Sequence, residues 1–212
     1  MEKSLKHIQL NFDHTIHFHI PEKIEHVYIL LHGYLLDGEF MYKSLKDIFP
    51  KNTAFIAPNA PFPVPVKKKD FYVPKYAWYF YDSSLQKFYV DFNPAVNYIE
   101  QIIQELNLES YPKTIIGYSQ GGYIAPKMAE TISKVEKVIG LACRFRQSNM
   151  TFMKGINYSQ IHCENDLIVD YKESKEDFKK LVEKGNLGEF ISLKDVGHRL
   201  DSNYLNELKK LL

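Results

Sequence analysis

Short apolar runs alternate with stretches of helical periodicity along most of this chain. Residues 27–31 are apolar throughout, which is typical of a strand covered on both faces. Residues 15–20 alternate polar and apolar side chains, which is typical of a strand with one face in water. Together with residues 5–10, this second run predicts an antiparallel hairpin at the edge of a sheet. Further strands are expected at residues 53–57, 113–118, 135–142, 160–163 and 189–193.

Helices are expected between these strands, at residues 38–48, 94–107, 120–132, 171–184 and 201–211. The second is the clearest, because Pro94 suits a first turn and apolar residues then recur at helical spacing. Strands that alternate with helices are typical of a mostly parallel sheet joined by crossover helices. The pattern therefore predicts an α/β fold, with helices on both faces of a central sheet, formed by residues 1–212 as a single domain.

Residues 58–92 interrupt this alternation. They contain five prolines, three consecutive lysines and eleven aromatic residues. Disordered segments are poor in aromatic residues, and a long excursion in a compact domain usually has a function. We therefore expect an ordered excursion over one end of the sheet, the end that carries the active site.

The composition narrows the classes of function. The 212 residues include 27 Lys and Arg against 26 Asp and Glu, so the net charge of +1 gives no electrostatic reason to expect a nucleic-acid partner. Two cysteines are too few for a disulfide framework, and the first residues lack the apolar stretch of a signal peptide, so we expect a cytoplasmic protein. The apolar runs are far shorter than the roughly 20 residues of a transmembrane helix. The N-terminal histidines have no carboxylate or cysteine at matching spacing, so no metal site is expected.

The strongest chemical signal is the sequence GYSQGG at residues 117–122, which follows an apolar strand and precedes a helix. In a G-x-S-x-G turn, the serine lies on a sharp strand-to-helix turn, and the glycines leave room for the neighbouring strand and helix. The turn exposes the hydroxyl at the N-terminus of a helix, where developing negative charge is stabilised. Ser119 is therefore the candidate nucleophile.

A serine hydroxyl needs a general base, and the base needs an acid that orients it. In this architecture the acid and then the histidine follow the nucleophile along the chain. Asp166 lies directly after a late strand and His198 after the last one, so these two residues are the candidate acid and base. Asp170, Asp195 and Glu164 remain alternatives for the acid.

The tetrahedral intermediate of such a reaction needs hydrogen-bond donors for its oxyanion. One is expected from the backbone N–H of Gln120, which follows the nucleophile. The other is expected from the backbone N–H of Tyr34, in the loop after the strand at residues 27–31.

These motifs resemble the phospholipase/carboxylesterase family, which includes the acyl-protein thioesterases. The resemblance implies an α/β-hydrolase fold and the hydrolysis of carboxylic esters or thioesters by a Ser-Asp-His triad without a cofactor. The chain departs from the family at Leu35, where a glycine is usual, and it places Pro126 inside an expected helix. The motifs that carry the resemblance are GYSQGG, LHG at 31–33, APNAP at 57–61, AWY at 77–79, HCENDLIVD at 162–170 and VGH at 196–198.

Apolar and aromatic side chains near the mouth of such a site suit an acyl chain or an aromatic ester. The candidate substrate-binding residues are Leu35, Phe71, Trp78, Tyr79 and Val169. The hypothesis is a serine hydrolase of small-molecule or acyl esters and thioesters. The alternatives are a catalytically silent binding protein on the same scaffold and a carboxylesterase for small esters with no lipid or protein substrate. The oligomeric state is left open.

Overall fold

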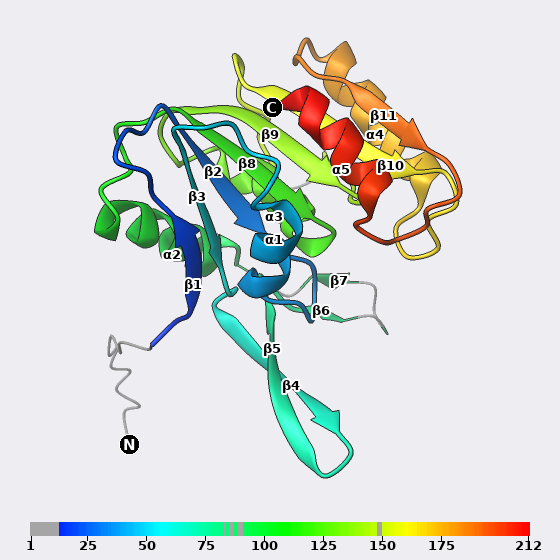
Figure 1. Ribbon diagram of the computed structural model, residues 1–212. Coiled ribbons are helices and arrows are strands. Elements are labelled where there is room, and N and C mark those ends of the chain that lie inside the picture. Colours follow the sequence, from blue (N-terminus) through cyan, green and yellow to red (C-terminus); the bar gives the residue numbers. More distant parts are fainter. Residues whose placement is uncertain (1–12, 83, 85–86, 89–90, 148–149) are drawn as a thin grey trace, which may run out of the picture.

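The computed structural model describes residues 13–82, 84, 87–88, 91–147 and 150–212. Within these residues, a seven-stranded sheet has the order β1-β3-β2-β8-β9-β10-β11 (Figure 1). Its neighbouring strands are parallel except for β1 and β3, which pair antiparallel. The strands of the sheet are β1 (Ile16–His19), β2 (His26–Leu31), β3 (Thr53–Pro58), β8 (Lys113–Tyr118), β9 (Val135–Leu141), β10 (Asn157–Cys163) and β11 (Phe190–Leu193).

Helices cover both faces of this sheet (Figure 1). One buried cluster contains apolar side chains of α1 and α5, and a second contains those of α2, α3 and α4. No helix among the described residues is long and apolar enough to span a membrane. The helices are α1 (Gly38–Leu45), α2 (Asn93–Glu105), α3 (Gln120–Met128), α4 (Tyr171–Glu183) and α5 (Ser202–Leu211).

The central strand β2 shows why both faces need cover. Val27, Ile29 and Leu31 belong to the cluster beneath α2, α3 and α4, whereas Tyr28 and Leu30 belong to the cluster beneath α1 and α5. Successive side chains of a strand point to opposite faces, so an apolar run of this kind is stable only between two layers. The predicted fold class, a mostly parallel α/β sheet with an antiparallel edge, is confirmed.

Two local expectations differ from the structure or lie outside it. β1 is an antiparallel edge strand, but its described partner is β3, and residues 5–10 of the expected hairpin lie outside the described residues. α3 ends at Met128, well before the expected end at residue 132 and two positions after Pro126. The proline removes a hydrogen bond to the carbonyl of Gly122 in the preceding turn, so it weakens the first half of α3. After Met128 the helical pattern gives way to tighter turns, in which Glu130 N–H donates to Lys127 and Thr131 N–H donates to Met128.

Residues 62–77 form a hairpin arm. β4 (Phe62–Lys68) pairs antiparallel with β5 (Phe71–Ala77), and the pair Lys68 and Phe71 lies at the tip. Figure 1 shows this arm projecting away from the body, so the expectation that the excursion lies over the sheet is wrong for these residues. Prolines in both strands remove donors that pairing with a further strand would need, which keeps the arm two-stranded. A short ribbon of β6 (Tyr81–Asp82) and β7 (Lys87–Phe88) follows.

Candidate active site

Ser119 lies on the turn between β8 and α3, with φ 51° and ψ −115°. A positive φ is strained for a residue with a side chain, and such strain is typical of a nucleophile held on a sharp turn. The glycines around it are sterically required. A Cβ at Gly117 would lie 2.3 Å from the carbonyl oxygen of Gly121, and a Cβ at Gly121 would lie 2.3 Å from the carbonyl oxygen of Leu31.

The structure brings the three candidate triad residues together. The Oγ of Ser119 lies 3.0 Å from Nε2 of His198, and Nδ1 of His198 lies 2.7 Å from Oδ2 of Asp166. Ser119 follows β8, Asp166 follows β10 and His198 follows β11. Because the carboxyl ends of parallel strands meet at one edge of the sheet, residues far apart in the sequence form one hydrogen-bonded chain. A carboxylate can only accept, so Nδ1 of His198 donates to Asp166 and Nε2 is left to accept from the serine hydroxyl.

Asp166 is a buried carboxylate with four hydrogen-bond donors. Oδ1 accepts from the backbone N–H groups of Ile168 (2.8 Å) and Val169 (3.0 Å). Oδ2 accepts from His198 and, at 3.1 Å, from Nε2 of His162. Burial alone would raise the pKa of this carboxyl, but the hydrogen bonds from the two imidazoles and the backbone outweigh it and hold the pKa well below its usual range. Asp166 is therefore ionised at neutral pH, as an orienting acid must be.

The alternative acids occupy other places. The Asp170 carboxylate caps α4 by accepting from the backbone N–H of Glu173 at 2.8 Å. Glu164 and Asp195 are exposed. Among the described residues, only Asp166 of these four carboxylates has a hydrogen bond to the His198 ring.

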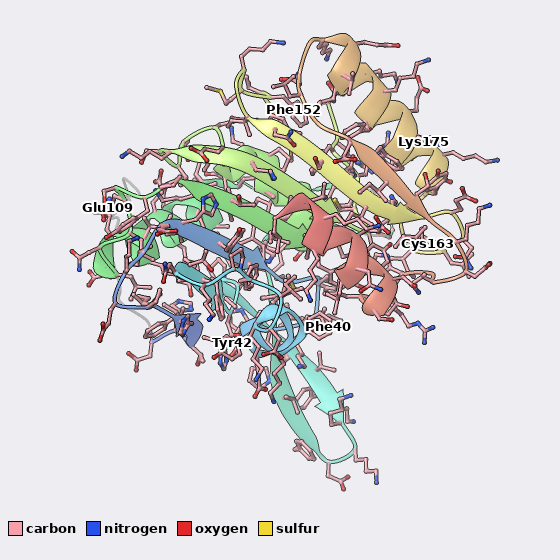
Figure 2. All side chains as sticks on the ribbon, turned by 45° about the horizontal axis from the view of Figure 1, so that its top comes forward. Phe40, Tyr42, Glu109, Phe152, Cys163 and Lys175 are labelled. Atoms are coloured by element: carbon pink, nitrogen blue, oxygen red, sulfur yellow. The ribbon has the colours of Figure 1, made fainter. Side chains whose placement is uncertain are left out.

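The loop that carries His198 is fixed to its neighbours on two sides. The hydroxyl of Tyr118 donates to the carbonyl oxygen of His198 at 3.0 Å. Burial, together with the Asp166 charge, raises the pKa of Tyr118 to about 12, so the phenol keeps its proton. The backbone N–H groups of Val196 and Gly197 each lie 3.3 Å from Sγ of Cys163, at the end of β10 (Figure 2).

The loop after β2 packs against the nucleophile. A Cβ at Gly33 would lie 3.3 Å from the Cβ of Ser119, so the glycine allows the loop to approach closely. Leu35 has φ 59°, and its N–H donates to the carbonyl oxygen of Tyr76 at 3.1 Å. Within the described part of the chain, the backbone N–H groups of Tyr34 and Gln120 have no protein acceptor. Both donors are thus available to a substrate oxygen.

His32 holds this loop in place, a role that the sequence did not reveal. It is fully buried, its Nε2 accepts from the N–H of Ala60 at 2.9 Å, and its Nδ1 therefore donates to the carbonyl oxygen of Gly33 at 2.7 Å. Burial lowers the pKa of His32 to about 4, so the ring is neutral at physiological pH. The only sequence signal was its position between the strand and the glycine.

The candidate substrate-binding residues fall into different environments. Leu35 is half-buried and lies in the loop after β2. Trp78 and Tyr79 are buried, with the Trp78 N–H donating to Oε1 of Gln120 and the Tyr79 carbonyl accepting from Nε2 of Gln120, each at 2.9 Å. Both side chains belong to the buried core, and their predicted role in substrate binding stays a prediction. The Trp78 ring N–H is satisfied within this core, because it donates to the carbonyl oxygen of His32 at 2.9 Å.

Val169 and Phe71 also differ from expectation. Val169 is buried, and its backbone N–H supports Asp166. Phe71 is exposed at the tip of the hairpin arm, so the structure does not bring it to the triad. The arm continues for six further residues before its base, a span of about 20 Å at the usual rise of a strand.

Apolar side chains that the sequence reasoning missed lie directly beside the acid. Leu167 is 93% exposed and Ile168 is 73% exposed, immediately after Asp166. Tyr34, on the oxyanion loop, is 51% exposed. The sequence could have indicated Leu167 and Ile168 as exposed apolar residues, because a short polar turn after the candidate acid offers no core in which to bury them. No group of three or more His, Cys, Asp or Glu residues that could hold a metal ion occurs in the described part of the chain.

The parallel sheet, the strained serine turn after β8 and the acid and histidine after β10 and β11 define an α/β-hydrolase fold. The chain belongs to the phospholipase/carboxylesterase family, whose sequence model matches residues 19–212. It is 28% identical to acyl-protein thioesterase 1 homolog 1 of Dictyostelium discoideum, over 87% of this chain and 88% of the relative.

Solved structures share the fold. Esterase PE8 superimposes with a TM-score of 0.74 and 19% identity, covering 94% of this chain and 98% of that structure. Acyl-protein thioesterase 2 of Zea mays superimposes with a TM-score of 0.70 and 18% identity, covering 93% of this chain and 96% of that structure. The likeness therefore extends over nearly the whole length of each protein.

Proposed function

We propose that this protein is a serine hydrolase that cleaves carboxylic ester or thioester bonds through an acyl-enzyme. The observation that carries the proposal is the continuous hydrogen-bonded chain from Ser119 through His198 to Asp166. Membership of the phospholipase/carboxylesterase family supports the same chemistry. The backbone of Ser119, with φ 51° and ψ −115°, supports it further, because strain on a sharp strand-to-helix turn is typical of a nucleophile.

The geometry gives each residue a role. The Ser119 oxygen attacks the substrate carbonyl carbon while Nε2 of His198 takes the hydroxyl proton. Asp166 keeps the proton on Nδ1 and stabilises the imidazolium. The N–H groups of Tyr34 and Gln120 bind the oxyanion, and the imidazolium then gives its proton to the departing alcohol or thiol. Water, activated by the same histidine, releases the acid and restores the serine.

An acyl group is the substrate portion that the surroundings favour. Leu167, Ile168 and Tyr34 present exposed apolar surface beside the triad, and apolar surface next to a catalytic site suits an acyl chain. The likeness to an acyl-protein thioesterase agrees with a thioester substrate. A protein that only binds its ligand would need this apolar surface but would not need an ordered triad.

The first test is covalent labelling with a fluorophosphonate probe. The wild-type protein should be labelled once and should hydrolyse p-nitrophenyl esters, and Ser119→Ala should lose both properties. Ser110→Ala is the matched control, because this serine is exposed and precedes the opposite end of β8. Absence of labelling in the wild type would favour the silent binding protein, and labelling that persists in Ser119→Ala would exclude Ser119 as the nucleophile.

Chain length separates an acyl hydrolase from a small-ester carboxylesterase. Each methylene that becomes buried adds up to about 0.8 kcal/mol, which is up to about fourfold in kcat/KM per methylene. An acyl-directed enzyme should show this rise across p-nitrophenyl esters of increasing length, and Leu167→Ser should flatten it. A rate that falls steadily beyond short esters would favour the small-ester alternative.

A further inference from the structure

His162 is a second histidine on the Asp166 carboxylate. It lies near the end of β10, four residues before Asp166, and is fully buried. Its Nε2 lies 3.1 Å from Oδ2 of Asp166 and 3.2 Å from the carbonyl oxygen of Val169. Both neighbours are acceptors, so Nε2 must carry the proton.

The other ring nitrogen fixes the charge of this histidine. Nδ1 of His162 is buried, and in the described part of the chain it has no hydrogen-bond partner. In a neutral ring with its proton on Nε2, Nδ1 is only an unused acceptor. A charged ring would leave a buried N–H without an acceptor, which is the costlier arrangement. His162 therefore acts as a neutral donor.

Two imidazoles share one oxygen of Asp166. Oδ1 is occupied by backbone N–H groups, so Oδ2 must serve both His198 at 2.7 Å and His162 at 3.1 Å. An additional donor restrains the plane of a carboxylate and takes up part of its negative charge. Less charge is then left to stabilise a proton on the neighbouring imidazole.

We propose that His162 is a positioning residue whose Nε2–H aims the Asp166 carboxylate at His198 and moderates its charge, so that His198 stays neutral and able to act as a base to lower pH. This inference rests on the proposed serine-hydrolase function. It adds a residue outside the triad that sets the pH range of that triad.

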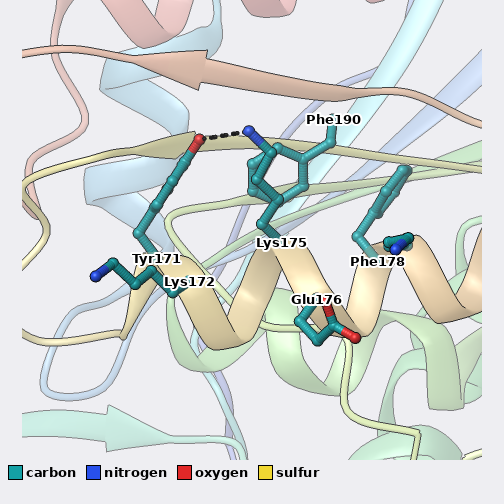
Figure 3. A pocket seen from close by; sticks show the side chains of 7 residues that line it. Tyr171, Lys172, Lys175, Glu176, Phe178 and Phe190 are labelled. Carbon is teal, nitrogen blue, oxygen red and sulfur yellow. Dashed lines mark hydrogen bonds between the residues drawn. The ribbon is translucent and has the colours of Figure 1, made fainter.

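Aromatic packing holds the His162 ring in this orientation. Tyr171 of α4 packs edge-on with ring centroids 5.8 Å apart, and Phe190 of β11 packs at 6.4 Å. The same two side chains line a separate cavity of about 420 Å³ (Figure 3). The rings of Tyr171 and Phe190 therefore contact both the cavity and the His162 ring. With its Nε2 bonded to two acceptors and its ring packed in this way, His162 has little freedom to turn.

The other titratable groups around Asp166 keep their protons. Burial raises the pKa of Tyr118 on β8 to about 12, and it raises the pKa values of Tyr204 on α5 and Cys143 after β9 further. Asp195 and Arg199, beside His198 on its own loop, are exposed to solvent and screened. His198 is therefore the group whose protonation controls the acid side of the rate profile.

The test compares the pH dependence of kcat/KM in three variants. His162→Phe keeps the ring shape but removes the donor, and we expect the acid midpoint of the profile to move up by about half a pH unit or more. His162→Gln, which retains an N–H donor, should return the midpoint toward the wild-type value. Tyr171→Phe, which keeps the packing around the ring, is the matched control and should leave the midpoint unchanged. An equal loss of activity at every pH, with no movement of the midpoint, would overturn the proposal.

A second measurement needs neither activity nor a substitution at His162. Nitrogen NMR of the wild-type protein, and of Ser119→Ala, should show the His162 ring at neutral pH with its single proton on Nε2. A proton on Nδ1, or a charged ring at neutral pH, would overturn the inference. Because this result does not depend on hydrolysis, it separates failure of the His162 role from failure of the proposed function.

Discussion

Protonation of His32 should destabilise the folded protein as the pH falls below neutrality. Its Nε2 accepts from the N–H of Ala60 in a fully buried environment. A proton on Nε2 would break this hydrogen bond and leave two buried N–H groups facing each other without an acceptor. Burial lowers the pKa of His32 from its ordinary value of 6.5 to about 4. The loop after β2, which Nδ1 of the ring supports by donating to the carbonyl of Gly33, would loosen together with the fold.

The sign and size of the change in the free energy of unfolding follow from these two pKa values of His32. Between pH 6.5 and about 4, the unfolded chain takes up a proton on this ring and the folded protein does not, so the free energy of unfolding decreases as the pH falls. Above this window the ring is neutral in both states and has no effect. At about pH 4.5 the difference amounts to about 2 to 3 kcal/mol of lost stability. Below about pH 4 both states are protonated, and this contribution stops growing.

Urea unfolding at about pH 7.5 and about pH 4.5 measures this loss. His26, whose pKa burial also lowers, contributes in the same direction, so the wild type must be compared with His32→Gln. The variant should be less stable at pH 7.5 but should lose about 2 to 3 kcal/mol less than the wild type between the two pH values. An equal loss in both proteins would refute the reasoning. If the variant does not fold, the NMR titration of the wild-type His32 ring decides, and a midpoint near 6.5 would refute it.

Three further predictions concern the turn at Ser119, the hairpin arm and the loop that carries His198. Gly121→Ala should lower the free energy of unfolding by at least about 2 kcal/mol in urea unfolding, because its Cβ would lie 2.3 Å from a backbone carbonyl of β2, whereas Gly155→Ala, with φ 86° and open space, should lose about 1 kcal/mol. Phe71→Ser, at the exposed tip of the arm, should leave kcat/KM for p-nitrophenyl esters within about twofold of wild type, and a tenfold loss would bring the tip into the site. Tyr118→Phe should lower kcat about fivefold with little change in KM, because it removes the 3.0 Å hydrogen bond to the carbonyl of the base, and a change in KM alone would contradict this role.

The core of the fold could be predicted because each of its strands is recognisable from the apolar pattern of its own residues. The apolar run at residues 27–31 requires cover on both faces, and the structure supplies it from α1 and α5 on one side and from α2, α3 and α4 on the other. The direction of the hairpin arm could not be predicted in this way. Its aromatic and proline content indicates order, but whether an arm lies on the body or leaves it depends on contacts between distant segments.

The site likewise has residues that local sequence predicts and residues whose roles depend on distant contacts. Ser119, Asp166 and His198 each follow an apolar strand, and parallel strands bring their carboxyl ends to one edge, so their meeting follows from topology. His32 directly follows a strand and His162 lies near the end of one, yet their roles depend on hydrogen-bond partners that only the folded chain supplies. A local pattern cannot distinguish a histidine that holds a loop from one that fills a core.

Gln120 shows how the site and the excursion are joined. Its side-chain oxygen accepts from the backbone N–H of Trp78 and its side-chain nitrogen donates to the carbonyl of Tyr79, at 2.9 Å each, while its backbone N–H is the proposed oxyanion donor. A side-chain amide suits this pairing at any physiological pH, because its oxygen accepts and its NH₂ group donates within one planar group. The two bonds tie the segment that follows the hairpin arm to the first residue of α3, so a shift of that segment would move the backbone N–H that we propose as an oxyanion donor. The backbone of Trp78 and Tyr79 thus fixes the residue that follows Ser119.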